Sequence, residues 1–314
     1  MLKWSKLLCS DRLRRSTSEK REQPEKKDLR SEFEKDYDRV VYCTPFRRLQ
    51  DKARVWPLEP NDAVHTRLAH SIEVARTAQG LTQRVAANLV GKQIIYKSQA
   101  RNLATLAETC GLIHDFGNPP FGHAGEEAMK TWFQEALLKE SESEKPVLKW
   151  KKDDLTRLGE RVFGITEKWN GRPDRCYVND FLRFDGNPRT IRLISRLQVV
   201  ADFKGLNLTA ATLAAVQKYR GDSNKQKSSD DDHLHSKLGY LQSEKEVVHE
   251  TRKMTGTEEA RHPVTILVEA ADDIVYSTVD LEDARRKGVI TWEEVQKYLK
   301  DHICDQISES DTSE

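Results

Sequence analysis

Apolar residues recur at helical spacing in long stretches of the chain. In residues 65–90 they follow the 3.6-residue period of an α-helix. Residues 102–117 are mostly apolar and stop before a Pro-Pro pair at 119–120, so they predict a buried helix with a sharp end. A third strong helix is predicted to begin near Pro263. The pattern therefore predicts a mainly α fold.

Shorter signals complete this mainly α prediction. Helix is expected to resume over residues 123–140. Asn187, which precedes a proline, has the pattern of a helix N-cap, and Thr291 with Glu294 forms a capping box for the last helix. β-Branched residues around a glycine favour at most a short β-hairpin within 197–209.

Charged and polar stretches divide the chain. Residues 1–30 carry ten basic against five acidic residues and predict a charged arm, either a solvated tail or a nucleic-acid contact. Residues 31–300 form the predicted folded domain, with flexible segments near 139–155 and 221–245. Residues 301–314 read as a polar tail.

Composition narrows the class of protein. The 52 basic and 51 acidic residues of the 314-residue chain leave a net charge of +1, so global charge gives no reason to expect nucleic-acid or membrane attraction. The five cysteines are scattered without a CxxC pair, which fits neither a disulfide framework nor a zinc ribbon. With no apolar run of about 18 residues, we expect a cytoplasmic protein without membrane contact.

Histidines and aspartates inside the most apolar predicted helices suggest a metal site. If these helices pack together, His70, the pair His114–Asp115, and either Asp272 or Asp273 become candidates to converge. Each alone is more simply a hydrogen-bonded core residue or an arginine partner. Together they form a mixed nitrogen and oxygen set that suits a divalent ion with open positions.

The order and length of these motifs carry a resemblance. The chain reads "RLAHS", then "GLIHDFGNPPFGHAGE", then "EAADDIVYSTVDLEDA". In this it resembles the histidine-aspartate (HD) superfamily, and specifically its deoxyguanosine triphosphate triphosphohydrolase (dGTPase-like) branch. Further similar segments are "TPFRRLQDKARVWPLE", "FDGNPRTIRLISRLQ", "GLNLT" and "QKYR", so the similarity runs from about residue 31 to 292. It implies an HD-domain helical bundle.

The resemblance also implies a metal site and an activity. A divalent ion (Mn, Mg, Fe, Ni or Co) would be held by His70, His114, Asp115 and Asp272. The family has an aspartate, a tyrosine four residues later and a second aspartate four residues after that. Asp272, Tyr276 and Asp280 match this pattern, so Asp272 is chosen over Asp273. The implied reaction, of the phosphoric monoester hydrolase class, is hydrolysis of deoxynucleoside triphosphates, with dGTP expected, to deoxynucleoside and inorganic tripolyphosphate.

Two titratable residues follow the Pro-Pro turn. By resemblance His123 would act as a general acid or base, and Glu126 would orient it or handle its proton. A straight helix would carry His123 about 13 Å along the axis from His114, at about 1.5 Å per residue. The turn can fold it back toward the metal.

The resemblance assigns substrate contacts to Arg54, Arg67, Asn118, Asn187, Lys218, Tyr276 and Asp280. Arg67 and Lys218 would bind phosphates, for which surface salt bridges are the alternative. Tyr276 would exclude a 2′-hydroxyl, and Asp280 would accept a hydrogen bond from the 3′-hydroxyl. Asn118 and Asn187 could instead serve as a turn residue and a helix cap.

Two departures from the family stand out. Arg54 replaces a glutamine that usually faces the sugar. The usual C-terminal helical part of the family is expected to be absent, so the chain is read as a short member or a fragment.

The expected partners are a dNTP substrate, single-stranded DNA and further copies of the chain, since the family forms homo-oligomers, including hexamers. Two other functions stay open. One is another HD phosphohydrolase, either a nucleotidase or a phosphodiesterase. The other is a nucleotide-sensing protein that binds single-stranded nucleic acid.

Overall fold

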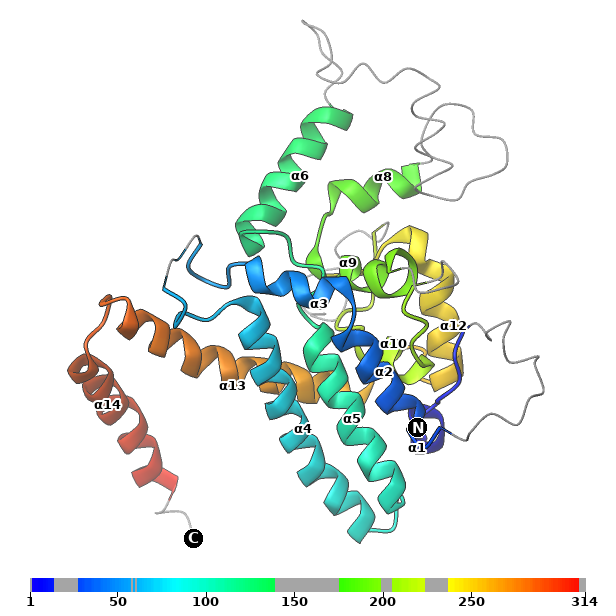
Figure 1. Cartoon of the computed structure of the whole chain (residues 1–314), viewed down its shortest axis with the longest axis horizontal. Helices are drawn as coiled ribbons and strands as arrows, with labels where there is room; N and C mark the ends of the chain where they lie inside the picture. Colours follow the sequence, from blue (N-terminus) through cyan, green and yellow to red (C-terminus); the bar gives the residue numbers. More distant parts are fainter. Residues whose placement is uncertain are drawn as a thin grey trace, which may run out of the picture.

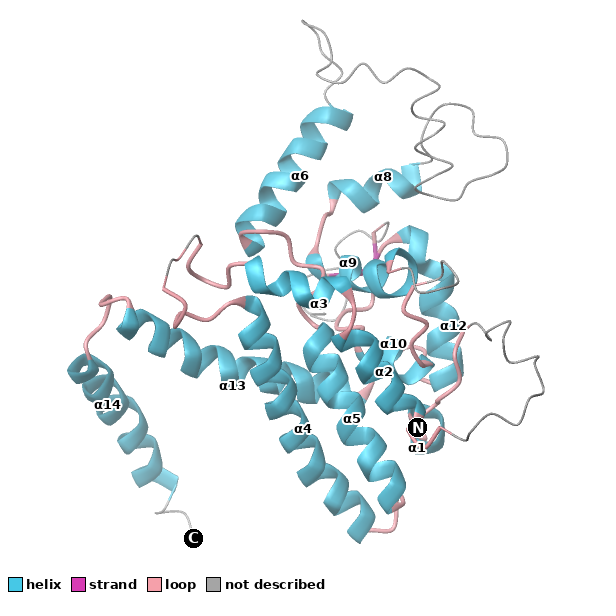
Figure 2. Ribbon diagram, viewed as in Figure 1, coloured by secondary structure: helices cyan, strands magenta, loops and turns pink. Residues whose placement is uncertain are grey.

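A computed structural model describes residues 2–13, 28–57, 59, 61–138, 175–198, 205–223 and 237–310. Across these residues the chain is mainly α, as predicted (Figures 1 and 2). The helices are α1 (Trp4–Leu7), α2 (Glu32–Val41), α3 (Thr44–Arg48), α4 (Arg67–Gly91), α5 (Lys97–Ile113), α6 (Gly122–Leu138), α8 (Arg175–Leu182), α9 (Gly186–Arg192), α10 (Ala210–Ala215), α12 (Lys245–Thr255), α13 (Pro263–Arg286) and α14 (Trp292–Ser310). A π-helical turn, Leu193–Leu197, follows α9, and short 3-10 turns lie at Leu49–Asp51 and Gln242–Glu244.

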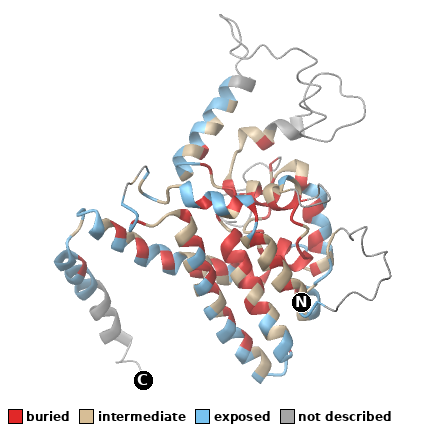
Figure 3. Cartoon of the chain, in the orientation of Figure 1, coloured by how far each residue is buried: buried red, intermediate tan, exposed pale blue. Residues whose placement is uncertain are grey.

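Helices α4, α5 and α13 form the centre of the fold. α4 and α5 lie side by side, and α13 packs across them (Figure 1). Their shared faces belong to one apolar cluster, and buried residues concentrate where they meet α10 (Figure 3). The helices approach closely at Gly111, where an added Cβ would lie 2.5 Å from the Cα of Ala75. The glycine thus lets the end of α5 sit against the start of α4.

Residues 2–13 are part of the folded unit, which corrects the predicted charged arm for this segment. Leu7 is buried, and the backbone N–H of Ala210 donates to the Asp11 carbonyl at 2.8 Å. Arg12 forms an ion pair with the buried Asp36 at 2.7 Å. These contacts hold the segment on α2 and α10. Residues 14–27 of the predicted arm lie outside the described residues.

Strand pairing occurs at the ends of the polar segment 221–245. β1 (Gly221–Asp222) runs parallel to β2 (Leu238–Tyr240), and Lys245 then begins α12. These two ends of the predicted flexible segment are ordered, while its residues 224–236 lie outside the described residues. Gly239 permits the pairing, because an added Cβ would lie 2.1 Å from the Tyr219 carbonyl oxygen.

Other predicted features fall partly outside the described residues. These are the β-hairpin, of which residues 199–204 are not described, and the segment 139–155. α14 continues through the predicted polar tail as far as Ser310. In the part of the chain that is described, no helix is both long and apolar enough to cross a membrane.

Side-chain caps fix where the helices begin. The Thr291 and Glu294 capping box is confirmed, because each side chain bonds the other residue's backbone N–H. α13 begins at Pro263, as predicted. The cap of α9 is a correction: the Asp185 carboxylate, not Asn187, accepts the first free N–H, donated by Asn187 itself at 2.8 Å. The helix begins earlier because Gly186 already adopts helical geometry.

Candidate metal centre

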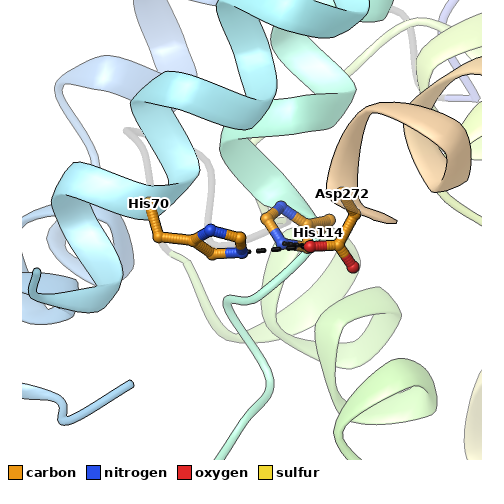
Figure 4. Close-up of side chains that lie close together, drawn as sticks. All are labelled: His70, His114 and Asp272. Atoms are coloured by element: carbon orange, nitrogen blue, oxygen red, sulfur yellow. Dashed lines mark ion pairs between the residues drawn. The ribbon is translucent and has the colours of Figure 1, made fainter. Parts of the chain in front are cut away.

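His70, His114 and Asp272 meet at the junction of α4, α5 and α13 (Figure 4). His70 lies in the first turn of α4, His114 caps the end of α5, and Asp272 lies on α13. The Asp272 Oδ1 atom is 3.1 Å from His70 Nε2 and 3.8 Å from His114 Nε2. One ligand atom from each residue lies within 4.8 Å of the others, so the group could hold a metal ion. Three of the four predicted ligands are therefore brought together.

The His114 ring is fixed in the tautomer that a metal ligand needs. Its Nδ1 lies 2.6 Å from the Gly111 carbonyl oxygen, which can only accept, so Nδ1 carries the proton. Nε2 then presents a lone pair toward the Asp272 carboxylate, and this buried atom has no hydrogen-bond partner among the described residues. Two electron pairs facing each other favour a cation between them.

Charge states in the group suit a divalent ion. Burial lowers the pKa of His70, which favours a neutral ring. Burial alone would raise the pKa of Asp272, but the hydrogen bond from His70 is the main cause that lowers it overall. Neutral imidazoles and an ionised carboxylate are the protonation states that metal binding requires. The residues present therefore fit a divalent metal ion.

Asp115 lies beside this group and is held by other partners. Its Oδ2 accepts from Arg67 Nη1 at 2.6 Å, and its Oδ1 accepts from Asn118 Nδ2 at 2.5 Å. His114 Nε2 is 3.6 Å away. Burial alone would raise the pKa of Asp115, but His114 and Arg67 hold it well below its usual range. Its role as a fourth ligand stays a prediction.

The turn after Asp115 is packed tightly against α9. The Gly117 N–H donates to Thr190 Oγ1 at 2.9 Å, and an added Cβ at Gly117 would lie 1.9 Å from the Gly186 carbonyl oxygen. Lys52 Nζ donates to the carbonyls of Phe116 and Asn118, at 3.2 and 2.8 Å. These contacts fix the backbone that follows the metal-site residues.

A group of cations beside this turn was missed by the sequence reasoning. Burial, together with the nearby Arg189, Arg67 and Arg48, lowers the pKa of Lys52 to about 8. Within the described residues no ion pair neutralises Arg48, Lys52 or Arg189. The only sequence signal was their place in the family-like segments "TPFRRLQDKARVWPLE" and "FDGNPRTIRLISRLQ". Uncompensated cations next to a metal site favour an anionic ligand.

His123 and Glu126 form a pair beyond the Pro-Pro turn. Phe121 and Gly122 have positive φ angles of 66° and 53°, so the backbone is irregular where α6 begins. The His123 Nδ1 lies 2.9 Å from Glu126 Oε2, and Glu126 Oε1 accepts from the Gly186 N–H at 2.8 Å. The His123 side chain is 96% exposed, so the structure does not bring it into the metal group.

The predicted sugar-binding residues lie together along α13. Arg54 Nη1 is 3.0 Å from Asp280 Oδ1, and the Arg54 guanidinium lies 5.4 Å from the centre of the Tyr276 ring. Tyr276 is 60% exposed, so one part of its ring is free to contact a ligand. The departure at Arg54 therefore sits against both residues that were predicted to contact the sugar.

Lys218 and Asn187 lie near His114. Both line a small cavity whose wall also includes His114. Lys218 Nζ is 3.7 Å from Glu269 Oε1. The Asn187 side chain does not cap α9. Asp185 caps this helix and accepts a hydrogen bond from Asn187 Nδ2 at 2.9 Å.

Comparison with known proteins agrees with this geometry. Residues 67–201 match the HD domain family. The chain is 36% identical over 312 residues to a deoxyguanosinetriphosphate triphosphohydrolase-like protein of Listeria monocytogenes, covering 95% of this chain and 61% of that protein. It is 35% identical to a protein of the same name from Synechocystis, covering 95% of this chain and 63% of that protein. It is 33% identical to a deoxyguanosinetriphosphate triphosphohydrolase of Enterobacter, covering 86% of this chain and 53% of that protein.

The chain is thus an HD-domain protein. Within that class it belongs to the family of deoxyguanosinetriphosphate triphosphohydrolase-like proteins. It spans about three fifths of the length of the first two relatives.

Proposed function

We propose that this protein is a metal-dependent hydrolase that converts deoxynucleoside triphosphates, dGTP foremost, to deoxynucleoside and inorganic tripolyphosphate. One observation carries the proposal: the His70, His114 and Asp272 group lies next to a set of cations that have no ion-pair partner in the described part of the chain. A metal group beside such cations suits a substrate with several phosphates. The names of the relatives point to the same substrate class.

The metal would be held by His70, His114 and Asp272, with Asp115 as the expected fourth ligand. When bound, a divalent ion supplies Lewis-acid polarisation of a phosphoryl oxygen and lowers the pKa of a coordinated water. Mn²⁺, Mg²⁺, Fe²⁺, Ni²⁺ and Co²⁺ all suit a mixed nitrogen and oxygen ligand set.

Proton transfer is assigned to His123. Because Glu126 accepts from its Nδ1, the Nε2 atom of the exposed ring is the one left to face a substrate. Glu126 is itself held by the Gly186 N–H, which fixes the direction of its carboxylate. Substrate that spans the metal group and the cations would bring the reacting phosphate toward this ring.

The phosphates and sugar would bind on opposite sides of the metal group. Lys218, Arg67 and the cations Arg48, Lys52 and Arg189 would receive the triphosphate. Tyr276 would contact the deoxyribose, and Asp280 its 3′-hydroxyl, with Arg54 between them.

Incubation of the purified chain with each dNTP and either Mn²⁺ or Mg²⁺, followed by product chromatography, tests this proposal. Tripolyphosphate and deoxynucleoside in equal amounts are expected. Failure of all four dNTPs with metal bound would contradict it. Release of orthophosphate from a nucleoside monophosphate would instead indicate a nucleotidase.

A further inference from the structure

Two arginines are buried together where β2 meets α12. The Arg220 side chain is 4% exposed, and Arg252 as a whole is 8% exposed. Arg220 precedes β1, and the Arg252 guanidinium on α12 lies 5.2 Å from the centre of the Tyr240 ring in β2. Arg220 Nη1 donates to the Ala260 carbonyl at 2.6 Å, and Arg252 Nε donates to Gln217 Oε1 at 2.9 Å. Both guanidinium groups are therefore held in place.

Three of their remaining guanidinium nitrogens have no hydrogen-bond partner among the described residues. Arg220 Nε and Nη2 and Arg252 Nη2 are buried without a hydrogen bond. Among the described residues, the one carboxylate that forms an ion pair with either is Glu259, which is 3.8 Å from Arg220 Nη2, and its side chain is 94% exposed. The two like charges also act on each other, since burial and Arg220 lower the pKa of Arg252 to about 10. Two buried cations with unused donors indicate a missing anion.

We propose that Arg220 and Arg252 form a binding site for a phosphate-class oxyanion, separate from the metal centre. Guanidinium groups bind phosphate through paired N–H donors, and two cations favour a doubly charged oxyanion over a single carboxylate. None of the metal-group residues takes part. Gln217, which accepts from Arg252 Nε, directly precedes Lys218, one of the residues that line the cavity beside His114.

The oxyanion could come from two sources. One is a free phosphate group, inorganic or on a nucleotide. The other is the chain itself, because Asp230, Asp231 and Asp232 lie in the sequence between β1 and β2. Their shared chemistry is an oxygen anion that accepts from the free N–H groups of Arg220 and Arg252. We assign the site to a free phosphate group.

The test measures the rise of Tm caused by inorganic phosphate, with chloride keeping the ionic strength constant. The full chain carries Asp272→Asn throughout and is measured with chelator, so that metal-bound phosphate does not contribute. Arg220→Gln and Arg252→Gln are compared with Arg101→Gln, a control whose side chain is 76% exposed and pairs with Glu34 at 2.6 Å. Each shift is taken within one variant, so a lower starting Tm does not obscure it. If the glutamine variants do not fold, the Arg220→Lys variant is measured in their place.

Phosphate is expected to raise Tm in the parent and in Arg101→Gln. The apparent affinity for phosphate should fall about tenfold or more in Arg220→Gln and Arg252→Gln, since each loses charge-assisted hydrogen bonds. Arg220→Lys should lose a smaller part. No shift in the parent, or equal shifts in all variants, overturns the proposal. Phosphate binding that appears only after Asp230, Asp231 and Asp232 are replaced by Asn would overturn the assignment to a free phosphate group. It would show that the chain's own carboxylates occupy the site.

Discussion

At the scale of single residues, one hydrogen bond determines whether His114 can bind a metal. The Gly111 carbonyl holds the proton on Nδ1, which leaves the Nε2 lone pair facing Asp272. His123 differs in kind, because its ring is exposed and its Nδ1 bonds Glu126. A ligand and a proton-transfer residue should therefore respond differently to replacement.

We expect His114→Ala and Asp272→Ala to lose the bound metal, whereas His123→Ala keeps its metal content near that of the wild type. Turnover by His123→Ala should fall about 100-fold or more, the usual contribution of a general acid or base. Elemental analysis and kcat on the same preparations give both quantities. Asp115→Ala should lose the metal as well. Retention of metal in that variant would limit Asp115 to binding Arg67.

At the scale of elements, close contacts hold the turn after Asp115 against α9. Gly117 has no room for a side chain, because its Cβ would lie 2.5 Å from the Thr190 backbone nitrogen. Gly80, in the interior of α4, has nothing within 4 Å of the equivalent position. Replacing Gly80 by alanine is therefore a control for the same replacement at Gly117.

Gly117→Ala is expected to lower the free energy of unfolding by about 1 to 3 kcal/mol, as overpacking does, and to reduce turnover by displacing the turn. Gly80→Ala should instead raise the free energy of unfolding, by up to about 1 kcal/mol, because alanine favours helix. Urea denaturation and kcat measure these effects. Similar stability changes in both variants would show that the tight contact at Gly117 is not decisive.

A second element-scale prediction concerns the start of α13. His262 accepts from the Val264 N–H at its Nδ1 and lies 3.0 Å from the Leu7 carbonyl through its Nε2, so the neutral ring joins α13 to α1. Burial lowers the pKa of His262 from 6.5 to about 4. The unfolded chain therefore takes up the proton first. The stabilisation is complete above about pH 6.5 and is lost as the pH falls toward 4.

The lost free energy should amount to about 3 kcal/mol by pH 4. His262→Asn keeps an N-cap acceptor but removes this titration. The stability of the wild type minus that of the variant should shrink by this amount between pH 7 and pH 4 in urea denaturation. Parallel pH profiles of the two proteins would contradict the assignment.

The long helices could be predicted from sequence because apolar periodicity records burial on one face. Helix starts were less certain: Asp185, not Asn187, caps α9, since two neighbouring residues both suit a cap and only backbone geometry chooses between them. The β1 and β2 strands lie in a polar segment whose composition predicts a loop. Their pairing depends on contacts that come from elsewhere in the chain.

At the scale of the whole molecule, the N-terminal segment is tied to the body by a buried charge pair. Asp36 is fully buried, binds Arg12, and also accepts from the Thr209 N–H at 2.9 Å. The composition of residues 1–30 concealed this, because Arg12 looks like one basic residue among many. Asp38, two residues on, pairs with the exposed Arg30 at 2.5 Å.

Asp36→Asn should lower the free energy of unfolding by about 1.5 to 3 kcal/mol, because it removes the fully buried one of the two carboxylates that pair with Arg12 and leaves only the partly exposed Glu32. Asp38→Asn should cost less than about 1 kcal/mol, since exposed pairs contribute little. Chemical denaturation compares the two. Equal losses would mean that the N-terminal segment is not held by the buried pair.

The site was predictable to the extent that its residues lie in long motifs. His70, His114 and Asp272 could be named because their motifs are specific, and the structure brings them together from three helices. The cations near the site could not be named from sequence; these are Arg48, Lys52 and Arg189. Only the folded chain, in its described part, shows that these side chains lie beside the site without an ion-pair partner.

The proposed activity requires water to attack the α-phosphorus of the substrate and to release tripolyphosphate intact. Turnover of dGTP with Mn²⁺ in ¹⁸O-labelled water tests it, with products analysed by mass spectrometry. We expect one labelled oxygen in tripolyphosphate, none in deoxyguanosine, and no turnover by Asp272→Asn. Label in orthophosphate or pyrophosphate, or equal turnover by Asp272→Asn, would contradict the proposed activity.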